Sequence, residues 1–248
     1  MKVLVCVKQV LDPGGIIVNR KAEKVFINRE EYILEPASKA ALEAANDVKQ
    51  AGAEVIAISV GPERVEDALR EALARGADRA IWIRSDGGDA TVIANLIAAA
   101  VRKIGAIDLI IAGQQALDTG AGELAPRLAE ALDWPQILGT AKLEVDGAIR
   151  AIVKREGFLQ VAASTPVVVA MLPEAYRGAY ADGWRLMDAY KKWNVETWST
   201  ADLDLGEDDL RSLTMKKEDA FPPERQLGTP VRDVEELVVM LKREKVIA

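Results

Sequence analysis

The sequence predicts an α/β fold built on a doubly wound, mostly parallel β-sheet. Two observations predict it: short, continuous apolar runs, and helix-patterned stretches that alternate with them through the first two-thirds of the 248-residue chain. Continuous apolar runs are typical of strands that are buried on both faces of a parallel sheet. Strands that alternate with helices form βαβ units, which place helices on both faces of that sheet. The runs cover residues 3–7, 55–60, 80–83 and 109–112.

Four helices are expected between and after these strands. Ser38 can cap the first helix, which runs to about residue 50 and has one apolar face. The second has an apolar stripe between residues 65 and 73, and Gly76 ends it. The third and fourth helices are expected over about residues 89–103 and 123–132.

The pattern then changes to that of a hairpin. Asp146 and Gly147 separate two strand-like runs at residues 143–145 and 149–152, which is a strong β-hairpin signal. A further strand is expected at residues 167–171. This region can extend the sheet with antiparallel edge strands.

The C-terminal part is predicted to be an extended arm that ends in a helix. Residues 173–198 are aromatic and irregular, and residues 203–230 are polar and contain prolines. We therefore expect an α/β domain over residues 1–200 and an arm over residues 201–248. The last helix, over about residues 233–245, has an apolar stripe that needs a covering surface, either on its own domain or on a partner. The stripe consists of Val234, Leu237, Val238 and Leu241.

Composition and charge exclude several classes of protein. The net charge of −7, with both signs interspersed, argues against a nucleic-acid binder. No apolar run reaches the length of a membrane-spanning helix, and the first residues form a strand-like run in place of a signal peptide. The single cysteine cannot form an internal disulfide, which fits a reducing cytoplasm.

The absence of histidine restricts the chemistry further. It removes the commonest general base, the Ser-His-Asp and Cys-His arrangements, and the commonest metal ligand. One cysteine also excludes an all-cysteine zinc or iron–sulfur site. Carboxylate or lysine chemistry remains, or chemistry carried by a bound cofactor. The acids Asp12, Glu35, Asp118 and Glu123 show no spacing that singles out a pair, so surface or capping roles are expected for them.

Three strands end at small or turn-forming residues, where open parallel sheets bind their ligands. These ends lie at residues 6–8, 60–62 and 112–114. Glycine there lets backbone N–H groups approach a phosphate, and the following helix N-terminus adds a favourable dipole. A glycine-proline pair can also simply turn the chain, so both interpretations stay open.

Two glycine-containing segments have weaker signals. Residues 120–125 match the dinucleotide fingerprint formally, but they lie several residues after the strand and not in the first βα unit. A Rossmann-type NAD site is therefore not expected, although the segment can wrap a nucleotide in another way. Residues 85–89 faintly resemble the loop of ATP pyrophosphatases in the wrong order and position. A turn in which Asp89 caps the next helix is expected there.

Several segments, taken in order, match one known family. They lie at residues 3–10, 35–36, 59–62, 70–80, 112–118 and 132–135, with short pieces at 186–187, 191–192 and 198–199. The most specific is Arg-Glu-Ala-Leu-Ala-Arg-Gly-Ala-Asp-Arg-Ala at residues 70–80. In these segments the chain resembles the β subunit of electron transfer flavoproteins, over nearly its whole length and without large gaps.

The resemblance implies an adenine nucleotide α-hydrolase-like domain that is not catalytic alone. It would hold AMP, or a second FAD as in members that bifurcate electrons. It would pair with an α subunit that carries the redox-active FAD, and together they would pass electrons between a dehydrogenase and an acceptor. Residues 201–248 would pack on the α subunit, and a loop at about residues 175–186 would recognise the dehydrogenase.

The resemblance also assigns site residues by position. The partner-recognition residues would be Tyr180, Gly183 and Trp184. The nucleotide contacts would be Cys6, Pro36, Ala37, Ser38, Val60, Gly113, Gln114, Gln115, Asp118, Thr119, Gly120, Ala121, Gly122, Glu123 and Leu124.

The chain departs from the family pattern in three places. The family usually reads Asp-Gly-Asp-Thr-x-Gln where residues 118–123 read Asp-Thr-Gly-Ala-Gly-Glu. Glu123 thus replaces a neutral amide, Glu35 replaces an asparagine, and Gly183 stands where the family has an anchoring leucine. An uncompensated carboxylate about 4 Å from a phosphate costs about 4 kcal/mol at an effective dielectric near 20. Either backbone amides and the helix dipole outweigh this charge, or Glu123 turns away, or the ligand differs.

Three functions are therefore compared. The first is an electron-transfer subunit whose flavin carries the chemistry. The second is a nucleotide-sensing module of the same fold without redox activity, which the altered phosphate loop favours. The third is an adenylating enzyme, which the absence of histidine disfavours.

Overall fold

The computed structural model describes residues 1–50, 52–176, 180–215, 221 and 228–247. The chain divides into two compact units. The first consists of Met1–Ile17 and Val25–Lys216, and the second of Val18–Lys24 and Lys217–Ala248. The expected division at residue 200 stays a prediction.

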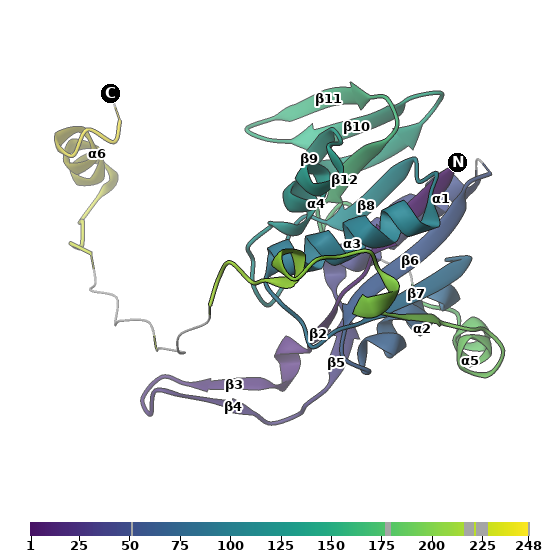
Figure 1. Ribbon diagram of the computed structural model, residues 1–248. Coiled ribbons are helices and arrows are strands. Elements are labelled where there is room, and N and C mark those ends of the chain that lie inside the picture. The colour runs from purple at the N-terminus through teal and green to yellow at the C-terminus, as the bar shows by residue number, and fades with distance from the viewer. Residues whose placement is uncertain (51, 177–179, 216–220, 222–227, 248) are drawn as a thin grey trace. The chain divides into compact units, whose positions relative to one another are not determined.

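A nine-stranded sheet forms the centre of the first unit (Figure 1), in the order β11-β10-β9-β12-β8-β1-β6-β7-β13. Neighbouring strands are parallel, except that β10 is antiparallel to β9 and β11. The predicted doubly wound, mostly parallel sheet is confirmed. The strands are β1 (Lys2–Cys6), β6 (Glu54–Gly61), β7 (Arg79–Arg84), β8 (Leu109–Gly113), β9 (Gln136–Val145), β10 (Ile149–Lys154), β11 (Phe158–Ala163), β12 (Val167–Met171) and β13 (Glu196–Ser199).

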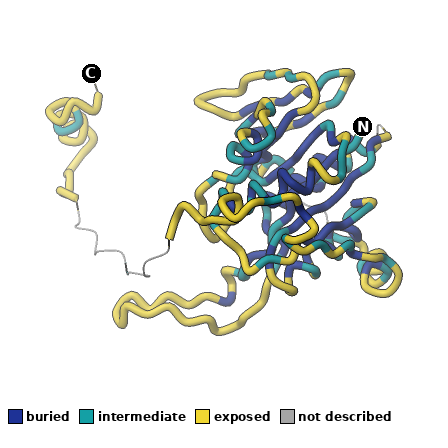
Figure 2. The backbone as a smooth tube through the Cα atoms, viewed as in Figure 1, coloured by how far each residue is buried: buried dark blue, intermediate teal, exposed yellow. Residues whose placement is uncertain are grey.

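Helices cover both faces of this sheet, because successive residues of a strand point to opposite sides. Val3 and Val5 of β1 pack in one apolar cluster with α1, α2 and α5. Leu4 and Cys6 pack in a second cluster with α3 and α4. Figure 2 shows in dark blue that the buried residues are concentrated in the sheet and in the helices beside it. The helices are α1 (Pro36–Gln50), α2 (Val65–Ala74), α3 (Ala90–Ile104), α4 (Leu124–Leu132) and α5 (Gly183–Lys191), with short 3₁₀ turns at Pro13–Gly15, Thr200–Asp202 and Asp208–Leu210.

The structure corrects two expectations about the later part of the chain. The antiparallel strands β10 and β11 do extend one edge of the sheet, as expected, but β12 lies inside the sheet, parallel to β8 and β9. All five of its residues are buried, which suits a strand covered on both faces. The segment expected to be irregular contains α5, whose first turn is capped by the Asp182 side chain. The hairpin of β9 and β10 across Asp146 and Gly147 is confirmed.

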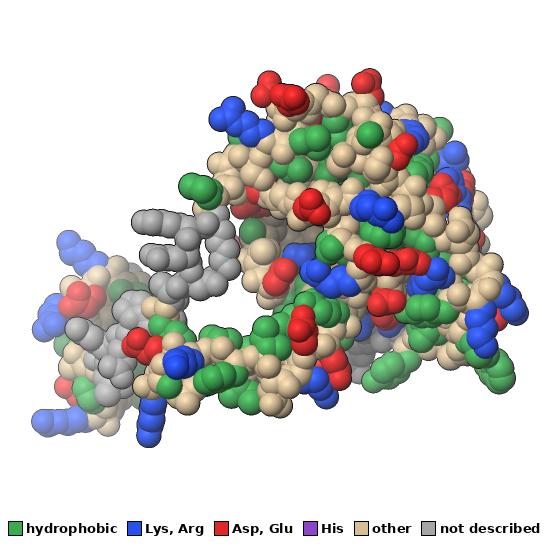
Figure 3. All heavy atoms as spheres, turned by 60° about the horizontal axis from the view of Figure 1, so that its bottom comes forward, with side chains coloured by type: hydrophobic (Ala, Val, Ile, Leu, Met, Phe, Trp, Pro, Cys, Tyr) green, Lys and Arg blue, Asp and Glu red, His purple; other side chains and the backbone are tan. Residues whose placement is uncertain are grey.

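Two further pairs of strands were not predicted. The strands β2 (Gln9–Leu11) and β5 (Tyr32–Leu34) pair with each other, and β3 (Ile16–Asn19) pairs with β4 (Lys24–Ile27). Every residue of β3 and β4 is exposed. Hydrophobic side chains gather along this hairpin, as Figure 3 shows in green. Basic and acidic side chains are interspersed over the face in the same view, in agreement with the mixed charge of the sequence.

The second unit contains the predicted last helix, α6 (Val234–Arg243). The Asp233 side chain caps it by accepting a hydrogen bond from Glu236 N at 2.8 Å. No residue of α6 is buried, and its apolar stripe therefore has no cover within the described part of this unit. Residues 216–220 and 222–227 of the predicted arm lie outside the described residues. None of the described helices is both long and apolar enough to cross a membrane.

Candidate functional site

The first turn of α1 meets the end of β1 through a buried carboxylate. Glu35 is 3% exposed, and its Oε2 accepts a hydrogen bond from Ser38 N at 2.8 Å. Glu35 therefore caps α1, and the prediction that Ser38 does so is wrong. The Ser38 hydroxyl is instead the acceptor for Lys8 N, at 3.1 Å, where the chain leaves β1. Burial raises the pKa of Glu35, while hydrogen bonds from Ala37 and Ser38 oppose the rise.

The end of β8 packs against the same turn of α1. A Cβ atom on Gly113 would lie 2.7 Å from the Cβ of Ala37, so only glycine fits without a shift. The next residue, Gln114, is fixed by two neighbouring strands. Its N–H donates to Met171 O at 2.7 Å, and its Oε1 accepts from Gly139 N at 2.6 Å. The Gln114 side chain is thus occupied in holding β8 and β9 together.

The loop that follows β8 depends on two glycines. Gly120 and Gly122 have φ angles of 62° and 67°, in the left-handed region that favours glycine. A Cβ on Gly122 would lie 3.1 Å from Gln114 O. The Gln115 side chain donates to Gly120 O at 3.2 Å. The loop therefore folds compactly on itself, and turns of this kind can direct backbone N–H groups toward an anion.

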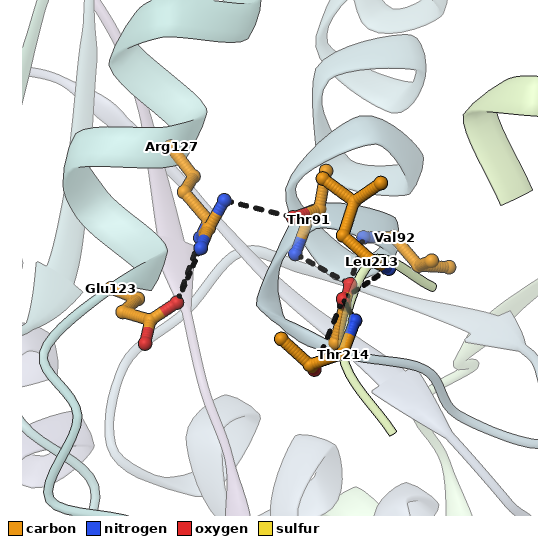
Figure 4. Close-up of polar contacts among 7 residues, drawn as sticks. Thr91, Val92, Glu123, Arg127, Leu213 and Thr214 are labelled. Carbon is orange, nitrogen blue, oxygen red and sulfur yellow. Dashed lines mark hydrogen bonds and ion pairs between the residues drawn. The ribbon is translucent and has the colours of Figure 1, made fainter. Parts of the chain in front are cut away.

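Both carboxylates of this loop are paired with cations. Lys8 Nζ lies 2.7 Å from Asp118 Oδ1. Glu123 Oε2 lies 2.7 Å from Arg127 Nη2, and Arg127 Nη1 donates to Thr91 Oγ1 at 2.9 Å (Figure 4). The charge of Glu123 is therefore compensated by a guanidinium one helical turn along α4.

The helices that start at this edge differ in how their first turns are capped. Asp89 caps α3, as predicted, with Oδ1 accepting from Thr91 N at 3.0 Å and Val92 N at 3.1 Å. Glu35 caps α1, and α2 has Glu66 and Asp67 in its first turn. In the described structure, α4 has neither a side-chain cap nor an acidic residue in its first turn. The N-cap residue is Glu123, whose carboxylate pairs with Arg127 and does not bind the first turn, so the N–H groups of this turn can still receive an anion.

Cys6 and Val60 lie at the same edge on neighbouring parallel strands. Burial raises the pKa of the Cys6 thiol to about 12, which keeps it protonated. Val60 is half-buried in β6. Cys6 belongs to the apolar cluster against which Val60 and Leu124 also pack. The described residues contain no cluster of three or more His, Cys, Asp or Glu that could hold a metal ion.

The three residues that the resemblance assigns to partner recognition lie at the start of α5. Tyr180 is 99% exposed and Trp184 is 76% exposed, while Gly183 is the first residue of the helix. Residues 177–179 of the expected recognition loop lie outside the described residues.

Two arginines hold α5 on α2. Arg185 Nε donates to Ala74 O, at the end of α2, at 2.8 Å. Arg70 of α2 donates in return to Ala189 O, near the end of α5. These contacts and the ion pairs of Lys8 and Arg127 were not predicted from the sequence. For Arg127, the spacing of four residues from Glu123 was a local signal of an ion pair on a helix.

The sequence matches the model of the family described as electron transfer flavoprotein domain, over residues 24–203. The chain belongs to the electron transfer flavoprotein family. The resemblance drawn from the sequence segments is confirmed.

Several curated relatives of this electron transfer flavoprotein chain are named as β subunits. The electron transfer flavoprotein subunit beta of Clostridium acetobutylicum is 34% identical over 216 residues, covering 85% of this chain and 83% of the relative. The Bacillus subtilis subunit beta is 33% identical over 256 residues, 98% of each chain. The caffeyl-CoA reductase-Etf complex subunit CarD of Acetobacterium woodii is 30% identical over 214 residues, 83% of this chain and 80% of the relative. This chain therefore has the role of a β subunit of an electron transfer flavoprotein.

Proposed function

We propose that this chain binds an adenine nucleotide, AMP or FAD, with its phosphate at the loop of residues 113–124. This proposal is supported mainly by the first turn of α4, which has no side-chain cap and follows a compact loop with two glycines in the left-handed region. Backbone N–H groups and a helix dipole stabilise a phosphate at such a position. The proposed site consists of the residues that the resemblance assigns as nucleotide contacts. Among them, Gln114 would contribute its main chain.

The charges at this loop fit a phosphate. The loop contains two acids, Asp118 and Glu123, and each is within 3 Å of a cation, Lys8 or Arg127. A phosphate at the first turn of α4 would therefore not face an isolated carboxylate. The missing hydroxyl and amide donors of the family pattern would be replaced by main-chain donors and by the Arg127 guanidinium.

The proposed assembly is a heterodimer with an α subunit that carries FAD, located in the cytoplasm. Flavin supplies the electron transfer when it is bound, and this chain positions the nucleotide and contributes to partner contacts. A dehydrogenase would dock at the exposed Tyr180 and Trp184 beside Gly183. The uncovered stripe of α6 would pack on the α subunit, because an exposed apolar helix face needs a partner surface.

The direct test is chromatography of the nucleotides released when the co-expressed complex is denatured. We expect one FAD from the α subunit and, in addition, either AMP or a second FAD. A complex that releases only the single FAD would refute nucleotide binding by this chain. A chain that binds nucleotide but forms no flavin-containing complex would instead support the nucleotide-sensing alternative.

A further inference from the structure

The carboxylate of Asp89 binds two segments that are far apart in the sequence. Its Oδ1 caps α3, whereas its Oδ2 accepts hydrogen bonds from Leu213 N at 2.6 Å, Thr214 N at 2.9 Å and Thr214 Oγ1 at 3.2 Å. Asp89 N in turn donates to Ser212 Oγ at 3.2 Å. Figure 4 shows Leu213 and Thr214 beside Thr91 and Val92 at the start of α3.

Few other interactions hold this part of the chain. Leu213 is 71% exposed and Met215 is 90% exposed, so apolar burial contributes little to the position of residues 211–215. Desolvation raises the pKa of Asp89, but hydrogen bonds from Val92, Thr214 and Leu213 outweigh it and hold the pKa at about 2. The carboxylate is therefore ionised at neutral pH, and charged acceptors make the stronger hydrogen bonds.

The contact lies just before the boundary between the two units. Thr214 is two residues before Lys216, the last residue of the first unit, and the following segment leads to the uncovered helix α6. A segment that starts from a fixed point loses less configurational freedom when its far end binds a partner.

We propose that Asp89 is a positioning residue for subunit association: it fixes the point at which the C-terminal segment leaves the α/β unit to reach the α subunit. The inference rests on the proposed heterodimer. It assigns to one carboxylate both the cap of α3 and the anchor of residues 212–214.

The variant Asp89→Asn separates these two roles. Asparagine caps helices as well as aspartate does, so its carbonyl oxygen can still accept from Thr91 and Val92. Its amide group cannot accept hydrogen bonds from Leu213 and Thr214. We expect about tenfold faster amide exchange at residues 213 and 214 and about tenfold weaker binding of the α subunit, the equivalent of one hydrogen bond to a charged group. Amide exchange at residues 91 and 92, and the nucleotide content of the complex, should stay at wild-type levels.

Two further variants complete the experiment. Asp86→Asn removes the same charge from the same exposed loop and should leave exchange and binding unchanged. Leu213→Pro removes one donor to Asp89 from outside the helix and should weaken binding like Asp89→Asn. The double variant Asp89→Asn/Leu213→Pro should bind the α subunit no more weakly than either single variant does, because both substitutions disrupt the same contact between Asp89 and residues 213 and 214.

The outcomes separate the two proposals. Wild-type affinity for the α subunit in both Asp89→Asn and Leu213→Pro overturns the positioning role, even when exchange at residues 213 and 214 rises. A wild-type chain that does not bind the α subunit refutes the proposed heterodimer, and the positioning role falls with it. Equal loss of protection at residues 91 and 213 in Asp89→Asn shows a general structural role and also overturns the proposal.

Discussion

At the N-terminus of α1, the acid that replaces a family asparagine is buried and caps the helix. Sequence pattern favoured Ser38 as the cap, because serine is common at that position. In the structure Glu35 reaches forward to Ser38 N, and the serine hydroxyl is engaged by Lys8 N. Glutamate in place of asparagine has an energetic consequence, because burying an ionised carboxylate costs more free energy than burying a neutral amide.

Replacing Glu35 by Gln should therefore change how stability depends on pH. The folded pKa of Glu35 is raised, so the folded state binds the proton more tightly than the unfolded state does. Stability from this group is present in acid and is lost as pH rises above the ordinary value of 4.5. Glu35→Gln should gain free energy of unfolding relative to wild type between pH 4.5 and pH 7.5, measured by urea denaturation. A difference that does not vary with pH would contradict this expectation.

Arg127 and Glu123 offer a second test at the residue scale. Arg127→Gln leaves the Glu123 carboxylate without its guanidinium partner beside the proposed phosphate position. We expect AMP to bind about tenfold more weakly, measured by titration calorimetry, because the unpaired carboxylate of Glu123 would repel the phosphate. Solvent partly screens this exposed charge, which limits the loss of affinity. Glu123→Gln should bind AMP at least as tightly as wild type and serves as the matched control. Equal affinities in wild type and Arg127→Gln would place the phosphate elsewhere.

Gly113 is a third residue whose identity is fixed by a neighbour. In Gly113→Ala the new methyl group would lie 2.7 Å from the Cβ of Ala37. Overpacking at such a contact should lower the free energy of unfolding by about 1–3 kcal/mol in urea. Gly157→Ala, with nothing within 4 Å of the added Cβ, should change it little. The double variant Gly113→Ala/Ala37→Gly should recover part of the loss, and no recovery would show that the clash lies elsewhere.

At the scale of elements, α2 and α5 each place an arginine at the C-terminal end of the other. Cations are favourable at helix C-termini, where carbonyl groups lack partners. Arg185 lies on α5, directly after the exposed Trp184, so its contact also orients the proposed docking surface.

Removing this contact should loosen α5 without unfolding the sheet. Arg185→Gln should cost about 1–2 kcal/mol of stability, the scale of hydrogen bonds from a charged donor. Amide exchange over Gly183–Lys191 should rise, while exchange in β1 stays slow. Lys192→Gln removes an exposed ion pair with Asp188 and should have little effect. Unchanged exchange in α5 after Arg185→Gln would refute the proposed role of Arg185.

The elements that could be predicted are those whose burial follows a regular pattern. The buried strands β1, β6, β7 and β8 and the helices between them have continuous or periodic apolar residues, which the sequence displays directly. The strands β3 and β4 contain apolar runs of only three residues, 16–18 and 25–27, and these runs are exposed. In α5 only Ala189 is buried, so none of these elements has the longer pattern that predicts a buried strand or helix. The order of the strands, which puts β12 between β8 and β9, depends on contacts distant in sequence.

The candidate site could be predicted only in part, for the same reason. Parallel strands end at one edge, so residues such as Gly113 could be placed there from the sequence. The ion pair of Lys8 and Asp118 joins residues 110 positions apart, and no local pattern indicates it. Local pattern also does not show that Glu35, and not Ser38, caps α1. The Ser38 hydroxyl is bound by Lys8 N, and that contact depends on where β1 ends.

At the scale of the whole molecule, the two apolar clusters lie entirely in the first unit. None of their residues in the described chain lies beyond Leu205. A chain that ends at residue 216 should therefore fold, with a free energy of unfolding within about 0.5 kcal/mol of wild type. It should lose at least tenfold in affinity for the α subunit, an effect of about 1.4 kcal/mol or more, measured by analytical ultracentrifugation. A truncated chain that is unfolded by circular dichroism would show that residues 217–248 contribute to the fold.

The position of Cys6 has a practical consequence for studying this two-unit chain. It is the single cysteine, it is buried in β1, and its protonated thiol is a poor nucleophile at neutral pH. Maleimide dyes or nitroxide spin labels should therefore react selectively with a cysteine introduced at an exposed position. Labels on α6 and on the sheet would then report separations between the two units by energy transfer or electron spin resonance, with the native thiol left in place.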